Sequence, residues 1–280
     1  MRELREAMSR DFPKISVVTP SFNQSEFLER TIKSVLDQGY PNLEYIIIDG
    51  GSTDGSVDII RKYQSQLAYW VSESDNGQSH AINKGLRRAT GDWVAWQNSD
   101  DIYYPGVFSN LAHVAGKNPG TKLIVGNMML IDPNDRILRD IRYVRPSHKA
   151  MLVEGMLLAN QATFWHRDVH QEIGWMDEDL HFSFDYEWFL RLTKCYEGVH
   201  VNRFWGALRL HGEAKLCKWP EKSALEHTTV RLCYGPELPL WEAGLYRAYR
   251  LAQLVANGEM RYVIRGILRR LKGKQGYDSY

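Results

Sequence analysis

Four short apolar runs, each closed by a polar loop, organise the first hundred residues of this 280-residue chain. They occupy residues 15–19, 43–48, 67–71 and 93–97. Between them, residues 26–38, 57–66 and 78–89 carry apolar side chains at the spacing of a helix. Strands that alternate with helices over short connections are typically parallel and joined by right-handed crossovers. The sequence therefore predicts an α/β fold with a mostly parallel sheet flanked by helices.

The loops that follow these runs are polar and contain several carboxylates. In an open α/β sheet, ligands bind at the edge formed by the carboxyl ends of the strands. Helices that begin at this edge offer free N–H groups to phosphate, and an acidic edge binds a diphosphate through a metal ion. The residues expected to converge there are Thr19, Asn23, Asp49, Asp54, Asp75 and Asp100.

Asp100 and Asp101 stand side by side after the fourth run, in the stretch 91–101. Two adjacent carboxylates repel each other unless a positive group lies beside them. A hard divalent cation such as Mn²⁺ or Mg²⁺ is the simplest such group, and it would in turn hold a phosphate. The alternative, from these residues alone, is a solvated turn that leads into the next helix.

Other ligand-binding motifs are excluded. No two glycines are spaced as GxG, and residues 50–56 have Walker A spacing but carry Ser56 in place of the lysine, so a nicotinamide enzyme and a P-loop NTPase are not expected. Three cysteines without CxxC spacing suggest neither a zinc site nor a disulfide framework. A formal net charge of +1 gives no argument for a nucleic-acid partner.

Composition and the chain's beginning bear on location. Hydrophobic residues make up 44% of the chain and charged residues 25%, as in globular proteins. Residues 1–12 are charged throughout and cannot be a signal peptide. No apolar run approaches the roughly 20 residues of a membrane-spanning helix. We therefore expect a cytoplasmic protein.

Five motifs taken together resemble the family 2 glycosyltransferases, inverting enzymes with the GT-A fold. They lie at residues 19–23, 49–56, 75–78, 81–85 and 98–101. The resemblance covers about the first two thirds of the chain, and the combination is far more specific than any single motif. It implies a GT-A domain over residues 1–235 that transfers a sugar, with inversion, from a nucleotide-diphosphate donor that is usually a uridine derivative.

The resemblance also assigns the donor and metal sites. Asp100 matches the last residue of the DxD metal motif, and Asp101 would support it, although adjacent residues of an extended chain point to opposite faces. Asn98 departs from the motif because it occupies the first acidic place. The donor-binding residues implied are Thr19, Pro20, Asn23, Asp49, Ser52, Asp54, Asp75, Gly77, Gln78, Asn83, Lys84, Asn98 and Ser99.

Asp185 is the expected catalytic base. It matches the Asp of the family's Glu-Asp pair, in which Phe184 replaces the Glu. A displacement with inversion needs a group that takes the proton of the attacking hydroxyl, and the surrounding aromatic side chains would raise the pKa of this carboxyl toward neutrality. Two alternatives are that Asp185 only caps the helix running to Cys195, and that Glu187 is the base.

Further candidates lie on the acceptor or phosphate side. In related enzymes a histidine in the loop after a late strand, here predicted at 199–208, can reach the metal or the diphosphate. His211 and Lys215 would take these parts, unless the segment is an ordinary surface loop. Trp165 and Trp188 would stack on sugar rings, although tryptophan side chains more often lie in the core. The remaining candidates are Gln161, Trp165, Glu187, Trp188 and Arg191.

The rest of the chain predicts two additions. Residues 122–125, 127–131 and 137–143 are strand-like and predict an antiparallel extension beside the parallel sheet. Residues 236–280 predict a C-terminal amphipathic helical extension. Its polar face is basic, which is typical of an interfacial helix attracted to anionic lipid. The alternative is a helix that packs its apolar face on the domain. The basic residues are Arg261, Arg265, Arg269, Arg270, Lys272 and Lys274.

These observations predict a metal-dependent inverting glycosyltransferase of glycan assembly. Its partners would be a nucleotide-sugar donor and a glycan or lipid-linked acceptor, met at the inner face of the cell membrane, with no nucleic acid. One alternative is a metal-dependent phosphohydrolase, for which Asp185 would be dispensable. The other is a non-catalytic nucleotide-sugar-binding module, which Asn98 and Phe184 suggest.

Overall fold

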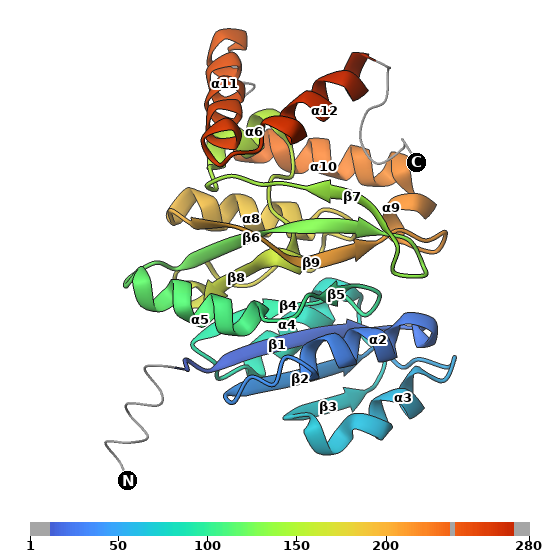
Figure 1. Ribbon diagram of the computed structural model, residues 1–280. Helices are drawn as coiled ribbons and strands as arrows, with labels where there is room; N and C mark the ends of the chain where they lie inside the picture. Colours follow the sequence, from blue (N-terminus) through green and yellow to red (C-terminus); the bar gives the residue numbers. More distant parts are fainter. Residues whose placement is uncertain (1–11, 236–238, 272–280) are drawn as a thin grey trace.

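The computed structural model describes residues 12–235 and 239–271, which form one mixed sheet with helices on both faces (Figure 1). Within these residues the sheet has nine strands in the order β3-β2-β1-β4-β8-β6-β9-β5, with β7 paired to β6. The predicted features at residues 1–11, 236–238 and 272–280 lie outside the described residues, Lys272 and Lys274 among them.

The first half of the sheet is parallel, as the sequence predicts. It consists of β1 (Ile15–Ser21), β2 (Leu43–Asp49), β3 (Tyr69–Ser72) and β4 (Trp93–Trp96). Every residue of β1 and β4 is buried, because helices cover both faces of the sheet. The connecting helices are α2 (Ser25–Leu36), α3 (Ser56–Tyr63), followed by a 3₁₀ turn (Gln64–Gln66), and α4 (Gln78–Arg88).

Helix α4 lies unusually close to the sheet at Gly85. A Cβ atom at this position would lie 2.3 Å from a methyl group of Val18 on β1, well inside contact distance. A glycine inside a helix costs about 1 kcal/mol relative to alanine. The close packing of α4 on β1 accounts for its presence, and it fixes the N-terminal end of α4 beside the carboxyl edge of β1.

The second half of the sheet is of mixed direction, so the predicted antiparallel extension is confirmed in part. Strand β8 (Thr163–His166) is antiparallel to β4 and to β6 (Leu123–Ile131), and β7 (Ile137–Ile141) is antiparallel to β6. Strand β9 (Val199–Arg209), however, is parallel to β6 and antiparallel to the short β5 (Ile102–Tyr103).

The predicted break between 122–125 and 127–131 is wrong, because β6 runs without interruption through Gly126. A Cβ atom at Gly126 would lie 2.6 Å from the indole ring of Trp205. The glycine is therefore explained by the packing of a side chain from β9 and not by a turn.

The halves of the sheet meet along β4 and β8, where Trp93 pairs with His166 and Val94 with Trp165. A layer of aromatic rings reinforces this seam. The Trp96 ring lies 5.5 Å from that of Trp165 and 5.6 Å from that of Phe189 on α8 (Phe184–Cys195).

The remaining helices follow β5. They are α5 (Val107–Lys117), α6 (His148–Glu154), α7 (Val169–Ile173), α9 (Lys215–Lys218), α10 (Pro220–Tyr234), α11 (Leu240–Ala256) and α12 (Met260–Leu271), with a 3₁₀ turn at Asn160–Ala162. Helix α10 packs on α8, and α11 packs on α6 and α12, at the end of the molecule opposite α3 (Figure 1). Within residues 12–235 and 239–271, no helix is long and apolar enough to cross a membrane.

Candidate active site

Asp100 and His211 meet at the carboxyl edge of the sheet. Asp100 follows β4 and His211 follows β9, and the Oδ2 atom of Asp100 lies 3.0 Å from Nε2 of His211. The ring of Phe27 on α2 packs against the imidazole, with 4.6 Å between ring centres. Two residues that are 111 positions apart in the chain thus form one polar pair, as the sequence analysis expects.

The pair has the spacing of two metal ligands. Two neighbouring ligands of an octahedral Mg²⁺, each at about 2.1 Å, lie about 3.0 Å apart. Within residues 12–235 and 239–271, no three His, Cys, Asp or Glu side chains are grouped to hold a metal ion. Asp100 and His211 would therefore supply two ligands of a cation, and a bound diphosphate or water would have to supply the others.

Asp101, expected to support the metal, is a structural residue, and that expectation is wrong. Its side chain is fully buried, and both carboxylate oxygens accept hydrogen bonds from the protein. The donors are Arg209 N at 2.8 Å, Gln161 Nε2 at 2.6 Å and Asn98 Nδ2 at 3.0 Å. Burial and the neighbouring charge of Asp100 raise the pKa of Asp101, which these three donors oppose. Asp100 and Asp101 have different partners, His211 for the first and these three donors for the second.

The departure at Asn98 follows from the role of Asp101. The Nδ2 group of Asn98 donates to Asp101, while its Oδ1 atom accepts from Gln78 Nε2 at 2.9 Å. An aspartate at position 98 would have no donor and would place a second negative charge against Asp101. The asparagine is therefore the residue that a buried carboxylate at position 101 requires.

Arg209, at the end of β9, holds the loop after β4 in place. No motif in the sequence predicted this role. The Arg209 side chain is buried over the ring of Phe27, and its Nε donates to the backbone oxygen of Asp100 at 2.7 Å. The guanidinium also pairs with Asp135 in the β6–β7 turn at 2.5 Å. An arginine at the end of an apolar strand has no sequence signal that distinguishes it from a surface residue.

Asp49, which the resemblance assigns to the base and ribose, instead shapes its own loop. It is fully buried. Its Oδ2 accepts from Ser52 N at 2.9 Å and from Ser72 Oγ at 2.7 Å, and its Oδ1 accepts from Ser52 Oγ at 2.6 Å. The assignment of Asp49 to the base and ribose stays a prediction, made for a carboxylate that already has partners in its own loop.

Several other predicted donor residues also hold the loops of this edge. The Oδ1 atom of Asn23, whose φ is 50°, accepts from Thr53 N at 2.9 Å and so joins the loops after β1 and β2. Asp54 accepts from Ser25 N and Ser56 N, at the starts of α2 and α3. Asp75 accepts from Gly77 N at 2.8 Å, next to the first residue of α4. These contacts fix the shape of the loops at the carboxyl edge of the sheet.

Four predicted donor residues do not present a side chain to this edge. Thr19 is buried with its hydroxyl 3.0 Å from that of Tyr45. Asn83 is buried and bonds to the backbone of Met176. Pro20 and Ser99 are buried too, so their side chains cannot meet a ligand. Lys84 is partly exposed and forms an ion pair with Glu73.

Asp185 lies in the first turn of α8, and burial raises its pKa to about 6. Ser183 occupies the N-cap position, so the alternative that Asp185 is the cap is not supported. The carboxylate accepts from Tyr186 N at 2.7 Å, which together with the charge of Lys215 opposes the rise in pKa. A carboxyl group that titrates near neutrality is suited to accept a proton.

Lys215 lies beside the start of α8, with its Nζ atom 5.8 Å from the ring centre of Phe184. Burial lowers its pKa, while the charges of Asp185, Glu226, Asp100 and Asp75 act in the opposite direction. Its Nζ donates to the backbone oxygen of His181 at 3.2 Å. Lys215 therefore lies close to the expected base Asp185, and it follows the expected metal ligand His211 by four residues.

Glu226 on α10 holds the loop that precedes Asp185, and the sequence analysis missed it. Its carboxylate accepts from three consecutive backbone N–H groups, those of His181 at 3.2 Å, Phe182 at 2.7 Å and Ser183 at 2.6 Å. A glutamate on a polar helix is normally a solvated residue, so the pattern gave no signal.

The remaining residues predicted on the acceptor side have partners inside the protein. Trp165 and Trp188 are fully buried, and their rings pack 5.6 Å apart in the core. Glu187 pairs with Arg191 at 2.6 Å, so neither is free for a substrate. Gln161 is buried against Asp101.

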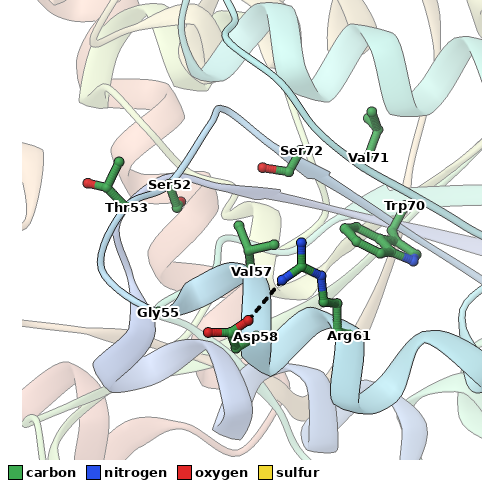
Figure 2. Close-up of a pocket in the computed structure, with 9 residues that line it drawn as sticks. All are labelled: Ser52, Thr53, Gly55, Val57, Asp58, Arg61, Trp70, Val71 and Ser72. Atoms are coloured by element: carbon green, nitrogen blue, oxygen red, sulfur yellow. Dashed lines mark hydrogen bonds and ion pairs between the residues drawn. The ribbon is translucent and has the colours of Figure 1, made fainter.

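A cavity of about 650 Å³ lies on the outer side of the loop after β2 (Figure 2). The Arg61 guanidinium is turned toward Asp58, with which it pairs at 2.9 Å, and the ring of Trp70 lies beside the Arg61 side chain. Of the predicted donor residues, Ser52 alone is among the residues that line it, and Asp100, His211 and Asp185 do not contribute. The cavity therefore shares one predicted donor residue with the candidate site but none of its expected catalytic or metal-binding residues.

Comparisons with known proteins give the same assignment as the motifs. The family model Glycosyl transferase family 2 matches residues 16–186. An uncharacterised glycosyltransferase of Mycobacterium tuberculosis is 33% identical over 193 residues, which are 68% of this chain and 72% of that protein. A putative teichuronic acid biosynthesis glycosyltransferase of Bacillus subtilis is 44% identical over 92 residues, or 32% of this chain and 36% of the relative.

Solved structures share the fold. TarS 1–349 of S. aureus in complex with UDP-GlcNAc superposes with a TM-score of 0.65 at 16% identity, over 87% of this chain and 73% of that one. The mannosyltransferase PcManGT of Pyrobaculum calidifontis, in complex with GDP-Man and Mn²⁺, gives a TM-score of 0.60 at 18% identity, over 93% and 81%. The chain spans 43% of the longer TarS chain. With the GT-A fold and a family match over more than half its length, the chain belongs to glycosyl transferase family 2 and is a glycosyltransferase.

Proposed function

We propose that this glycosyltransferase moves a sugar from a nucleotide-diphosphate donor to an acceptor hydroxyl with inversion at the anomeric carbon. The observation that carries the proposal is the pair of Asp100 and His211, 3.0 Å apart at the carboxyl edge of the sheet, together with Lys215, whose Nζ atom lies 5.8 Å from the ring centre of Phe184, the residue before Asp185. A base, a metal ligand and a cation within reach of one another are the groups that a direct displacement needs.

In the proposed reaction, the acceptor oxygen attacks the anomeric carbon while the bond from that carbon to the diphosphate oxygen breaks. Asp185 takes the proton of the acceptor hydroxyl, and the electron pair of the broken bond leaves with the diphosphate. The pKa of about 6 keeps most of the Asp185 carboxyl ionised at neutral pH and basic enough to assist. Lys215 would neutralise charge that develops on the leaving diphosphate.

A divalent cation, Mn²⁺ or Mg²⁺, fits the same scheme. Asp100 and His211 would hold it, and it would offset the charge of the diphosphate when bound. The complex of PcManGT with GDP-Man and Mn²⁺ supports this choice of group. Since Asp101 is used inside the protein, we expect the cation to bind together with the donor and not before it.

We favour a UDP-sugar as donor and a glycan or a lipid-linked glycan as acceptor. The TarS complex contains UDP-GlcNAc, and the Bacillus subtilis relative is named for teichuronic acid biosynthesis, both of which support this class. A lipid-linked acceptor would be met at the inner face of the cell membrane, which requires that the protein have a surface able to reach a bilayer.

Two measurements test the proposal. Isothermal titration should show that UDP binds more tightly in the presence of Mn²⁺, and a panel of nucleotide sugars should identify the donor by the mass gained by the acceptor. Asp185→Asn should keep donor binding while transfer falls about 100- to 10,000-fold. Turnover preserved in Asp185→Asn, with release of free phosphate and no acceptor product, would favour the phosphohydrolase instead.

A further inference from the structure

Helix α12 presents its apolar face to solvent. Met260, Ile264, Ile267, Leu268 and Leu271 recur at helical spacing and are between 48% and 79% exposed. A helix packed on a globular domain normally turns this face to the core. The alternative interpretation from the sequence, in which the apolar face of α12 lies on the domain, is therefore wrong.

The polar side of the helix is what holds α12 to the rest of the protein. Arg265 donates to Asp140 on β7 at 2.8 Å. Just before the helix, Glu259 pairs with Arg142 and accepts from Asn202 Nδ2 at 2.9 Å. These contacts keep the orientation of the helix, with Arg265 beside β7 and the apolar groups outward.

Helix α11 also exposes apolar residues, while Ala243 and Leu254 on its inner side are buried. Its polar residues bind α6, through Arg250 with Glu154 at 2.5 Å and Glu242 with Lys149 at 3.2 Å. Its exposed apolar residues follow one stripe of the helix and are between 40% and 90% exposed: Leu240, Trp241, Leu245, Leu251 and Val255. The two helices contact each other at one end of the molecule (Figure 1). We call their exposed apolar residues the α11–α12 face.

The charge on the helix selects the partner. Residues 260–271 contain four arginines and no acidic residue. Arg261 is exposed, and Arg269 is partly exposed. A second copy of the chain would bring an identical basic helix against this one, and like charges would oppose the contact. Anionic lipid headgroups attract the arginines, and the adjoining boundary with the acyl chains accepts the apolar residues.

We infer that the α11–α12 face docks onto a bilayer that contains anionic lipid. The inference adds a place of action to the proposed function, because a lipid-linked acceptor would be met there. It does not depend on the chemistry of transfer, since a protein that binds vesicles without transferring sugar would leave it intact.

The experiment is co-sedimentation of the full chain with phosphatidylcholine vesicles that contain phosphatidylglycerol. The wild-type protein should bind these vesicles and not vesicles of phosphatidylcholine alone. The variant Ile264→Ser/Ile267→Ser/Leu268→Ser should lower the partition coefficient about 100-fold, because it removes apolar surface without changing charge. The variant Arg261→Gln/Arg269→Gln should lower it about 30-fold.

Ile137→Ser is the matched control, since Ile137 is 62% exposed but lies on β7, outside the α11–α12 face. It should bind as the wild type does. Equal binding by the triple-serine variant would overturn the inference, as would equal binding of the wild type to neutral and anionic vesicles. So would sedimentation equilibrium without lipid, if the wild type formed a dimer that the triple-serine variant abolished.

Discussion

The Oε1 atom of Glu226 lies 2.6 Å from the backbone nitrogen of Ser183, two residues before Asp185. Helix α10 thereby sets the position of the loop that leads into the expected base. Three consecutive N–H groups converge on this one carboxylate, so the loop has a single acceptor for its backbone donors. Removing that acceptor leaves the donors without a partner, which is costly wherever water cannot replace it.

The two ways of altering Glu226 should give different results. Glu226→Ala should lower kcat about 100-fold, because the base would no longer be held in register with the acceptor. Glu226→Gln keeps an oxygen for Phe182 and Ser183 and should keep most of the activity. Because the charge of Glu226 raises the pKa of Asp185, this variant should also move the acid limb of the pH profile to lower pH.

Amide hydrogen exchange at residues 181–183 checks the structural part of this prediction without reference to activity. Exchange should accelerate in Glu226→Ala and change little in Glu226→Gln. Glu221→Ala, an exposed position on the same helix, is the control and should match the wild type in both measurements. Slow exchange preserved in Glu226→Ala would contradict the role of Glu226.

The pH dependence of transfer should follow Asp185. Its pKa of about 6 predicts that kcat/KM falls below pH 6, because the protonated carboxyl cannot accept a proton. Stability should change in the opposite sense. The folded pKa lies above the ordinary value of 3.8, so the contribution of Asp185 to the free energy of unfolding decreases as pH rises from that value through about 6. Denaturant titrations of the wild type and Asp185→Asn at several pH values should differ in this window.

Restoring the acidic first place of the DxD motif should harm the protein. Asn98→Asp removes a donor to Asp101 and adds a like charge, and should lower the free energy of unfolding by about 1–3 kcal/mol at pH 7. Urea unfolding measures this change. Since protonation relieves the repulsion, the deficit should shrink at low pH. An unaltered midpoint combined with tighter Mn²⁺ binding would show that Asn98 is merely a weakened metal ligand.

Metal dependence should rest on His211 and on bound donor. His211→Ala should weaken Mn²⁺-supported UDP binding by at least about 10-fold. UDP affinity without Mn²⁺ should stay the same, which separates loss of the cation from damage to the nucleotide site. Addition of a chelator to the wild type should reproduce the affinity of His211→Ala. His113→Ala on α5, whose side chain is exposed, is the control.

Arg209 should be among the most important residues for stability. Arg209→Met fills a similar volume but leaves the Asp100 carbonyl and Asp135 without their partner, and should cost about 3–5 kcal/mol. Chemical denaturation measures the loss. Arg203→Met, at an exposed position of the same strand, should be within about 0.5 kcal/mol of the wild type.

The sequence predicted the parallel half of the sheet because the signal is local there. Each strand from β1 to β4 is a short apolar run closed by turn residues, and each boundary was placed within a few residues. Strand β6 was predicted as two runs that leave out Gly126, because glycine is typical of turns. The actual reason for the glycine, the indole ring of Trp205, lies 79 residues further along the chain and carries no local mark.

Site residues were predicted correctly where a sequence motif identifies them. They were missed where contacts with residues far away in the sequence determine the role of the side chain. Asp100 and His211 were expected and are found together. Asp101, by contrast, was predicted to support the metal. The residues that enclose it, Gln161 and Arg209, lie 60 and 108 positions away, so its burial could not be predicted from its neighbours in the sequence. No spacing rule in the sequence separates a carboxylate that faces solvent from one enclosed by such partners.

The narrow seam between β4 and β8 has a consequence for how the protein is made. The loop after β4 is held by Gln161, Arg209 and His211, all of which are synthesised long after it. A nascent chain that has delivered its first hundred residues can pair its parallel strands, but Asp100 gains its partners only when β9 has left the ribosome. The pair of Asp100 and His211 thus forms last, and a product of interrupted translation would contain the loops after β1, β2 and β3 without this pair.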